Sequence, residues 1–423
     1  MNSAPSDSYA YNPLEVRRNF RFLFADCIFF IFGMAFIDLS TVIPAFLSTV
    51  TESSLAIGLI MAIRPASQLI PQLWAAHYLS GRTRHKSYLM KVASASRVAT
   101  LLFALTLFFS GPKDRGLMLT AFIIMFATFW LSEGFLGVSW TDLAAKTIPE
   151  RLRGRLWGST QAVGGLGAAL AGLLVAKILS SNGLPYPKNF ALLVFLGWIL
   201  FSISFTFLSF VREPDGPAEK QNGSFLEYAK SIKRIISADG ELKRFLLVQI
   251  LSAFYNLPFA FYIIYAKKAS GLGGGAVGLL LSAQLLGSVI WGALAGYISD
   301  RRGPKSAIML TALAGVAAPA LALLVKGQSI PLWIMIFFFL GAVSGSIYIG
   351  LTNYLLEMCK PGERRTYIGI MNTANAPALI FPVLGGIIVQ EVSFTAAFAL
   401  TAAAITLALI LASTLKSGCR AQA

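Results

Sequence analysis

Twelve long apolar segments, separated by shorter polar loops, follow one another along the chain. The segments are continuously apolar, unlike the strands of membrane barrels, in which apolar and polar residues alternate. Each is about 20 residues or longer, the length that an α-helix needs to cross a bilayer. The pattern therefore predicts an all-α membrane protein with twelve transmembrane helices, at residues 22–49, 55–79, 88–110, 117–143, 156–180, 189–211, 245–267, 276–299, 306–325, 331–357, 367–390 and 393–415.

The composition supports the same class of protein. The 423 residues are 56% hydrophobic and 13% charged, with a mean hydropathy of +0.69, whereas a soluble domain carries about 25% charged residues. A soluble enzyme and a disordered chain are therefore excluded. Three cysteines are also too few for a disulfide-rich secreted scaffold.

Lysine and arginine are distributed unevenly between the two sets of loops. The loops and tails on the side of the chain termini hold 26 of them, and the loops on the other side hold seven. Because basic residues stay on the cytoplasmic side, this bias predicts that both termini are cytoplasmic, in a multi-pass protein of the cell (inner) membrane. It also explains the net charge of +16 without a nucleic-acid partner.

The longest polar stretch divides six spans from six. It predicts a cytoplasmic tail at 1–21, a six-helix bundle at 22–211, a linker at 212–244, a second bundle at 245–415 and a tail at 416–423. Within the linker, Phe225, Ala229, Ile232 and Ile236 fall on one helical face. This spacing predicts either an amphipathic helix on the membrane surface or a solvated linker helix.

The two predicted bundles share local sequence features. The loop after the second span, residues 77–86, aligns without gaps with the loop after the eighth, residues 296–305, at an offset of 219. Two prolines in the loops after the fourth and tenth spans, Pro149 and Pro361, align at an offset of 212. Similar offsets at two places indicate a duplicated six-helix unit.

The loop after the eighth span carries a recognisable signature. It reads Gly296-Tyr-Ile-Ser-Asp300-Arg301-Arg302-Gly303-Pro304-Lys305. This resembles the G-x3-D-[RK]-x-G-[RK]-[RK] motif of the major facilitator superfamily, with proline at the first of the two final basic positions. The twelve-span topology resembles that family over the whole chain. The resemblance implies secondary transport by alternating access, in which one bundle rocks against the other around a bound solute.

Such loops are expected to latch the cytoplasmic side. Asp300 could bond to a helix N-terminus, or pair with Arg153 or Arg155 of the facing half. The alternative is that these charges only fix topology. The first-half loop departs from the motif, with Gly81 in place of the aspartate. The candidate gate residues are Arg82, Asp142, Arg153, Arg155, Gly296, Asp300, Arg301, Gly303, Lys305 and Glu357, with Asp142 facing Arg82 and Glu357 facing Arg301.

Five Asp, Glu, Lys or Arg residues lie within spans and at least four residues from either end, all in the first half: Asp26, Asp38, Arg64, Arg97 and Glu133. Charges inside a membrane are costly and usually functional. The helical rise of about 1.5 Å per residue places Asp38 and Arg64 at one depth, and Arg97 and Glu133 at another. These residues predict two ion pairs that either take up a proton, bind a substrate, or are static.

The second half offers neutral polar groups instead. The candidates for the wall of a substrate cavity are Gln249, Tyr255, Asn256, Tyr262, Gln284 and Asn353, and the further neutral polar residues in these spans are Tyr348, Asn372 and Asn375. Pro258 predicts a local break that frees backbone carbonyls in the seventh span. Hydrogen bonding between helices is the alternative role for most of these side chains.

A secondary transporter of a small solute, coupled to protons, fits these features best. An intramembrane enzyme is not expected, because the sequence holds only two histidines and no H-E-x-x-H or G-x-S-x-G motif with partners. No cofactor is expected, and the expected partners are a small solute, protons and the lipid bilayer, with the chain as a monomer. A sensor or lipid translocator on the same fold remains the alternative.

Overall fold

The structure, a computed structural model, describes residues 12–79, 85–214, 235–236, 239–325, 329–359 and 364–416. Most of the predicted amphipathic linker helix lies outside the described residues, and so does Arg82. Every regular element among the described residues is a helix. The longer helices are α1 (Pro13–Phe36), α2 (Val42–Val50), α3 (Ser54–Leu79), α4 (Lys86–Phe109), α5 (Arg115–Thr147), α6 (Glu150–Ser180), α7 (Lys188–Ser209), α9 (Gly240–Ser252), α10 (Phe261–Ser270), α11 (Gly274–Arg302), α12 (Pro304–Leu324), α13 (Ile330–Met358), α14 (Arg364–Ala374), α15 (Phe381–Glu391) and α16 (Phe394–Ser413).

These helices follow the predicted order of twelve crossings. Among the described residues, ten segments are long and apolar enough to span a bilayer on their own, and α9 with α10, bent by 41°, makes an eleventh. The remaining crossing is α3, whose apolar part is Ser54–Ser67. Three spans are broken within their length: α1 continues into α2, α9 into α10, and α14 into α15. The prediction of a twelve-helix membrane protein is confirmed.

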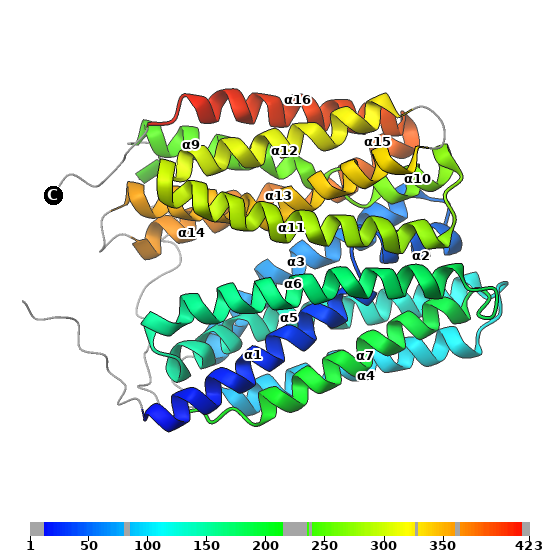
Figure 1. Ribbon diagram of the computed structural model, residues 1–423, viewed down its shortest axis with the longest axis horizontal. Helices are drawn as coiled ribbons and strands as arrows, with labels where there is room; N and C mark the ends of the chain where they lie inside the picture. The colour runs from blue at the N-terminus through cyan, green and yellow to red at the C-terminus, as the bar shows by residue number, and fades with distance from the viewer. Residues whose placement is uncertain are drawn as a thin grey trace, which may run out of the picture.

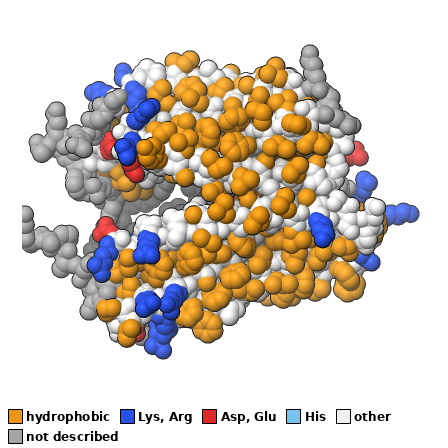
Figure 2. Space-filling view, in the orientation of Figure 1, with side chains coloured by type: hydrophobic (Ala, Val, Ile, Leu, Met, Phe, Trp, Pro, Cys, Tyr) orange, Lys and Arg blue, Asp and Glu red, His pale blue; other side chains and the backbone are white. Residues whose placement is uncertain are grey.

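The helices form two halves (Figure 1). In one half, α1 packs on α6 and α7, and α4 packs on α5 and α7; in the other, α13 packs on α11 and α12, and α16 packs on α9 and α12. The start of α1 and the end of α16 lie at the same end of the molecule, which we call the terminal end (Figure 1). Apolar side chains cover the visible flanks of both halves (Figure 2), as expected of surfaces that face lipid.

One contact repeats in both halves and supports the duplication. The Lys86 ammonium group, at the start of α4, donates to the carbonyl oxygens of Ser209 (2.5 Å) and Val211 (2.7 Å), at the end of α7. Lys305, 219 positions later, starts α12 and donates to two carbonyls at the end of α16, those of Ser413 and Leu415, at 2.7 and 2.6 Å. In each half a lysine therefore satisfies carbonyls that a helix end leaves without partners.

The halves meet most closely away from the terminal end. There α6 and α11 lie side by side (Figure 1). A Cβ atom on Gly278 would lie 2.1 Å from the backbone nitrogen of Ala176, so only glycine allows this approach. Ser282 donates to the Ala169 carbonyl across the same contact at 2.7 Å. On the other side of the molecule α3 packs on α15, and a Cβ atom on Gly58 would lie 2.4 Å from the Pro382 carbonyl oxygen.

The terminal end is open by comparison. Figure 2 shows a hollow between the two halves at this end. The hydrogen bonds that join described residues of the two halves lie in the part of the molecule away from it. The described structure is therefore closed at one end of the interface between the halves and open at the other.

Candidate functional site

A cavity of about 200 Å³ lies between the two halves. Each of the three broken spans contributes a lining residue at its break. Leu39 lies between α1 and α2, Asn256 between α9 and α10, and Asn375 between α14 and α15. Irregular backbone inside a membrane protein is tolerated where it is buried in protein or lines a water-filled cavity. The breaks therefore mark this cavity as the place where a solute can meet backbone and polar side chains.

Arg64 brings a positive charge to this cavity from α3. It lies ten residues after the start of the helix at Ser54, which is about 15 Å along the axis at the usual rise. Its side chain is exposed, and its guanidinium carbon lies 4.9 Å from the centre of the Trp130 ring. This distance is within the range of a cation–π contact. No acidic side chain among the described residues forms an ion pair with Arg64.

The second half supplies neutral polar groups to the same cavity. Tyr255 and Asn256, both predicted as cavity residues, line it, and so do Ser344, Tyr348 and Asn375. Tyr348 and Asn375 were among the further neutral polar residues noted in these spans, whereas Ser344 was missed. Nothing in a single helix shows which of its faces meets the other half.

The other four predicted cavity residues lie elsewhere. Tyr262 is fully buried and stacks on Phe398, and Gln249 donates to a backbone carbonyl of α14 at 2.9 Å. Asn353 donates to the Ser299 hydroxyl group at 3.0 Å. These are contacts within the second half, so they match the alternative of bonding between helices. Gln284 accepts a hydrogen bond from Ser40 of the first half.

Asp38 does not pair with Arg64, contrary to expectation. Its Oδ1 atom accepts hydrogen bonds from the backbone nitrogens and hydroxyl groups of both Ser40 and Thr41, at 2.7–2.9 Å. The helix has ended at Phe36, and the carboxylate therefore satisfies the backbone at the start of α2, as capping residues do. The depth estimate assumed an unbroken helix, and the break removes its basis.

A second and larger cavity, of about 540 Å³, lies inside the first half. It is lined by side chains from α1, α4, α5, α6 and α7, and three of them are the ionisable residues Asp26, Arg97 and Glu133. Arg97 and Glu133 form the predicted ion pair, with 3.3 Å between Nη1 and Oε1. Their side chains are 10% and 20% exposed, so water screens this pair much less than it screens a surface pair.

Not every polar atom of this pair has a hydrogen-bond partner among the described residues. Arg97 Nη1 also lies 2.7 Å from the Ser96 hydroxyl oxygen, and Arg97 Nε is buried without a hydrogen-bond partner among the described residues. Asp26 accepts hydrogen bonds from the Ser204 hydroxyl (2.6 Å) and from the indole nitrogen of Trp140 (3.0 Å). Both of these donors are neutral. The cavity therefore holds two carboxyl groups and one guanidinium group.

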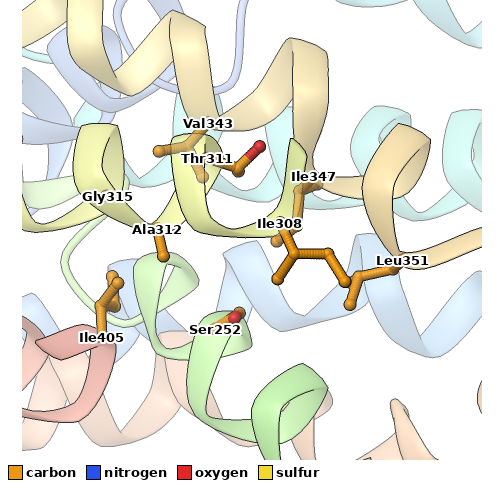
Figure 3. Close-up of a pocket in the computed structure, with 9 residues that line it drawn as sticks. All are labelled: Ser252, Ile308, Thr311, Ala312, Gly315, Val343, Ile347, Leu351 and Ile405. Atoms are coloured by element: carbon orange, nitrogen blue, oxygen red, sulfur yellow. The ribbon is translucent and has the colours of Figure 1, made fainter. Parts of the chain in front are cut away.

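The corresponding place in the second half is almost filled. A cavity of about 10 Å³ lies among α9, α12, α13 and α16, the counterparts of α1, α4, α5 and α7 (Figure 3). Apart from the hydroxyl groups of Ser252 and Thr311, its lining side chains are apolar. The Thr311 hydroxyl group bonds to that of Ser346 at 2.8 Å, between α12 and α13. A neutral hydroxyl pair thus joins α12 to α13, the helices that correspond to those joined by the ion pair.

The predicted latch at the terminal end is not formed. Asp300 is exposed, and no ion pair joins it to Arg153 or Arg155 within the described chain. The Arg153 guanidinium group instead donates to the carbonyl oxygens of Ala145 (2.8 Å) and Ile148 (2.9 Å). Because the halves are apart at this end, the two sides of the latch are out of reach of each other.

The remaining gate residues act within their own halves. Asp142, whose predicted partner Arg82 lies outside the described residues, lies 2.7 Å from both His85 Nδ1 and Lys146 Nζ. Lys146 also bonds to Glu213 at 3.2 Å. Glu213 was missed in the sequence, because a carboxylate just after the sixth span looks like an ordinary linker charge.

The signature loop between α11 and α12 contains a glycine with a positive φ. Gly303 has a φ of +85°, a conformation that favours glycine, and it separates α11 from α12. A Cβ atom on Gly296 would meet nothing within 4 Å. The Arg301 guanidinium group lies 5.3 Å from the Tyr297 ring centre, and no ion pair with Glu357 is formed.

Comparison with known proteins decides the family. The family profile described as Major Facilitator Superfamily matches residues 25–375 and 245–417. The chain belongs to the Major Facilitator Superfamily. It is therefore a multi-pass integral membrane transporter rather than an enzyme. Among curated protein sequences, none matches it.

Solved structures of this superfamily share the fold. A mutant of the nucleoside transporter NupG is 13% identical, with a TM-score of 0.70, over 94% of this chain and 99% of that one. A D-xylose-proton symporter is 16% identical, with a TM-score of 0.68, over 95% and 98% of the two chains. A bacterial homologue of the human lysosomal transporter Spinster, in an inward-facing conformation, is 15% identical, with a TM-score of 0.60, over 96% and 98%. At such identities the likeness shows the fold alone.

Proposed function

We propose that this transporter moves a small solute by alternating access and couples that movement to protons. The observation that carries the proposal is the cavity between the halves, which lies where three spans break and where the halves are closed at one end and open at the other. A rocking motion about this place would expose the cavity to the two sides of the membrane in turn. The proton symporter among the structural neighbours, which carries D-xylose, adds support.

The proton would be carried in the cavity of the first half. When Glu133 is charged, it compensates the charge of Arg97. A proton on Glu133 would remove that compensation and leave a buried guanidinium group, which is costly. Arg97 would then favour a new partner, and Asp26 lines the same cavity. Asp26 and Glu133 are therefore the proposed proton carriers.

Helix α5 joins the proton site to the solute site. Trp130, which stacks on Arg64, lies three residues before Glu133. Residues three apart in a helix are neighbours along its surface. A change of bonding at Glu133 that moves or rotates α5 would therefore move the surface on which Arg64 rests. This is the proposed route by which a proton and a solute affect each other.

The direct test is proton movement by the purified protein in lipid vesicles. Sugars, nucleosides, amino acids, organic acids and organic cations are added outside in turn, and the external pH is recorded. The proposal predicts a change of external pH with at least one solute, alkalinisation for symport or acidification for antiport, and no change in vesicles that lack the protein. Solute uptake with no proton movement at any pH would refute the coupling. Absence of uptake for every solute, with folded protein confirmed, would favour a sensor or a lipid translocator.

The orientation in the membrane is part of the proposal. The bias of basic residues supports cytoplasmic termini, so that the open end of the described structure would face the cytoplasm. Single cysteines at exposed positions such as Asp300 and Lys113, in a chain without its own cysteines, would be labelled in intact cells with an impermeant maleimide. The proposal predicts labelling at Lys113 alone, and labelling at Asp300 alone would reverse the orientation.

A further inference from the structure

We infer that the solute held between the halves is a small organic anion, and that Arg64 binds its carboxylate or phosphate group. This inference rests on the proposed transport function and adds the chemical class of the solute. Of the described residues that line the cavity, Arg64 alone carries a charge. The net charge of the described lining is therefore positive, which favours an anion and disfavours a cation.

The guanidinium group of Arg64 contacts an aromatic ring but has no acidic partner among the described residues. Its guanidinium carbon lies over the Trp130 ring, 4.9 Å from the ring centre, and a cation–π contact of this kind does not bring a hydrogen-bond acceptor to the N–H donors. Asp38, the acidic residue expected to neutralise Arg64, uses its Oδ1 atom for the backbone and hydroxyl groups of Ser40 and Thr41. A planar group with parallel N–H donors is the usual partner of carboxylates and phosphates.

Closure of the cavity would make this missing counterion important. Arg64 is exposed in the described structure, so water now solvates its charge. When the terminal end closes, that water is reduced, and an unpaired arginine within a membrane protein becomes costly. A bound anion would remove the cost. The same residue would thus select the solute and prevent the empty cavity from closing.

The neutral lining indicates what the rest of the solute looks like. Hydroxyl groups from Tyr255, Tyr348 and Ser344, and amides from Asn256 and Asn375, surround the cavity. Such groups bind hydroxyl and carbonyl oxygens. The volume of about 200 Å³ corresponds to roughly seven waters at about 30 Å³ each. We therefore expect a compact anion that carries further oxygen atoms, on the scale of a hydroxy acid or a short dicarboxylate.

Binding to the full-length protein tests the inference without any need for transport. Lactate, succinate and glycerol 3-phosphate serve as anionic probes, xylose and uridine as neutral probes, and choline as a cationic probe. Binding is followed by tryptophan fluorescence, because Trp130 stacks on the proposed anchor, and by thermal stabilisation in detergent. We expect at least one anion to bind, and the neutral and cationic probes to bind at least about tenfold more weakly.

Variants then decide whether Arg64 is responsible. We expect Arg64→Met to weaken anion binding by more than about tenfold, and Arg64→Lys, which keeps the charge but loses the planar donors, to weaken it less. Arg115→Met is the matched control, because Arg115 is an exposed arginine at the start of α5, and it should bind as the unmodified protein does. If Arg64→Met does not fold, Arg64→Lys carries the test.

Two results would overturn the inference. One is preference for a neutral or cationic probe over every anion, and the other is anion binding that is unchanged in the Arg64 variants. The proposed function is judged separately, by movement of the bound solute into vesicles. An anion that binds through Arg64 but is never moved would leave the anion site standing and refute transport. A neutral solute that is moved independently of Arg64 would support transport and refute the anion site.

Discussion

The two six-helix halves repeat one fold but join corresponding helices with different chemistry. In the first half, Arg97 on α4 pairs with Glu133 on α5, 36 positions later. In the second half, Thr311 on α12 pairs with Ser346 on α13, 35 positions later. The first pair borders a cavity of about 540 Å³ and the second one of about 10 Å³. A charged, loosely filled interior thus corresponds to a neutral, closely packed one.

This difference suggests a division of labour between the halves. A close-packed interior without ionisable groups resists change, because packed side chains have few alternative arrangements. An ion pair beside a cavity has alternatives, since its energy depends on protonation, on water and on neighbouring carboxyl groups. We therefore interpret the first half as the part that responds to protons and the second half as the rigid wall of the solute site.

The largest expected effect comes from placing a charge in the second half, which we call the neutral half because its hydroxyl pair is uncharged; the first half, with its ion pair, is the charged half. Thr311→Arg would add a long cationic side chain to a cavity of about 10 Å³ with no acidic partner in its lining. Overpacking and an unpaired buried charge should together prevent folding. Little monodisperse protein should be recovered by gel filtration in detergent. Recovery of normal amounts of Thr311→Arg would contradict the view that the two interiors differ.

The next effect comes from breaking the ion pair of the charged half. Arg97→Met leaves Glu133 buried without its partner, which should cost about 3 kcal/mol or more. The double variant Arg97→Thr with Glu133→Ser copies the hydroxyl pair of the second half, and it should regain much of that loss. Denaturation in detergent micelles measures both. A double variant no more stable than Arg97→Met would show that the two residues are not coupled.

A smaller and more selective effect is expected from Asp26. Asp26→Asn keeps one oxygen, which can accept from the Trp140 indole nitrogen, while its NH2 group can donate to the Ser204 hydroxyl oxygen, but it cannot take up a proton. The protein should fold, while proton-driven uptake should fall at least about tenfold, equivalent to about 1.4 kcal/mol. Uptake into vesicles with an imposed pH gradient measures this. Unchanged uptake would remove Asp26 from the proton site.

The smallest effect is expected in the neutral half. Thr311→Val removes one buried hydroxyl–hydroxyl bond, which should cost about 1 kcal/mol of stability. Proton-driven uptake should be unchanged, because no proton-carrying group is altered. The same denaturation and uptake measurements apply. A loss of uptake as large as that of Asp26→Asn would mean that coupling does not depend on the charges of the first half.

Much of the fold follows from patterns that lie within single segments. Apolar length predicts the twelve crossings, and Pro258 predicts the break between α9 and α10. The break between α1 and α2 has no such marker, because it depends on the carboxylate of Asp38 bonding to local backbone groups. The estimate of depth in the membrane assumed unbroken helices. It therefore predicted the pair of Arg97 with Glu133 but failed for Asp38 and Arg64, because the break precedes Asp38.

The site was less predictable, because it depends on which faces of distant helices meet. Tyr255 and Asn256 were predicted to line the cavity, and Tyr348 and Asn375 were noted only as polar residues of the same half. Ser344 became visible only in the structure. The neutral donors to Asp26 come from Trp140 and Ser204, far along the chain. The sequence does not show this proximity.

The central claim is that Glu133 couples solute movement to protons, and one comparison tests it most directly. Glu133→Gln and the unmodified protein are placed in vesicles, and two rates are measured for the same solute: uphill uptake driven by a pH gradient, and exchange at equal pH on both sides. The account predicts that the variant loses uphill uptake while exchange persists, because rocking and binding remain while the proton carrier that pairs with Arg97 is lost. Uphill uptake at an undiminished rate in Glu133→Gln would contradict it.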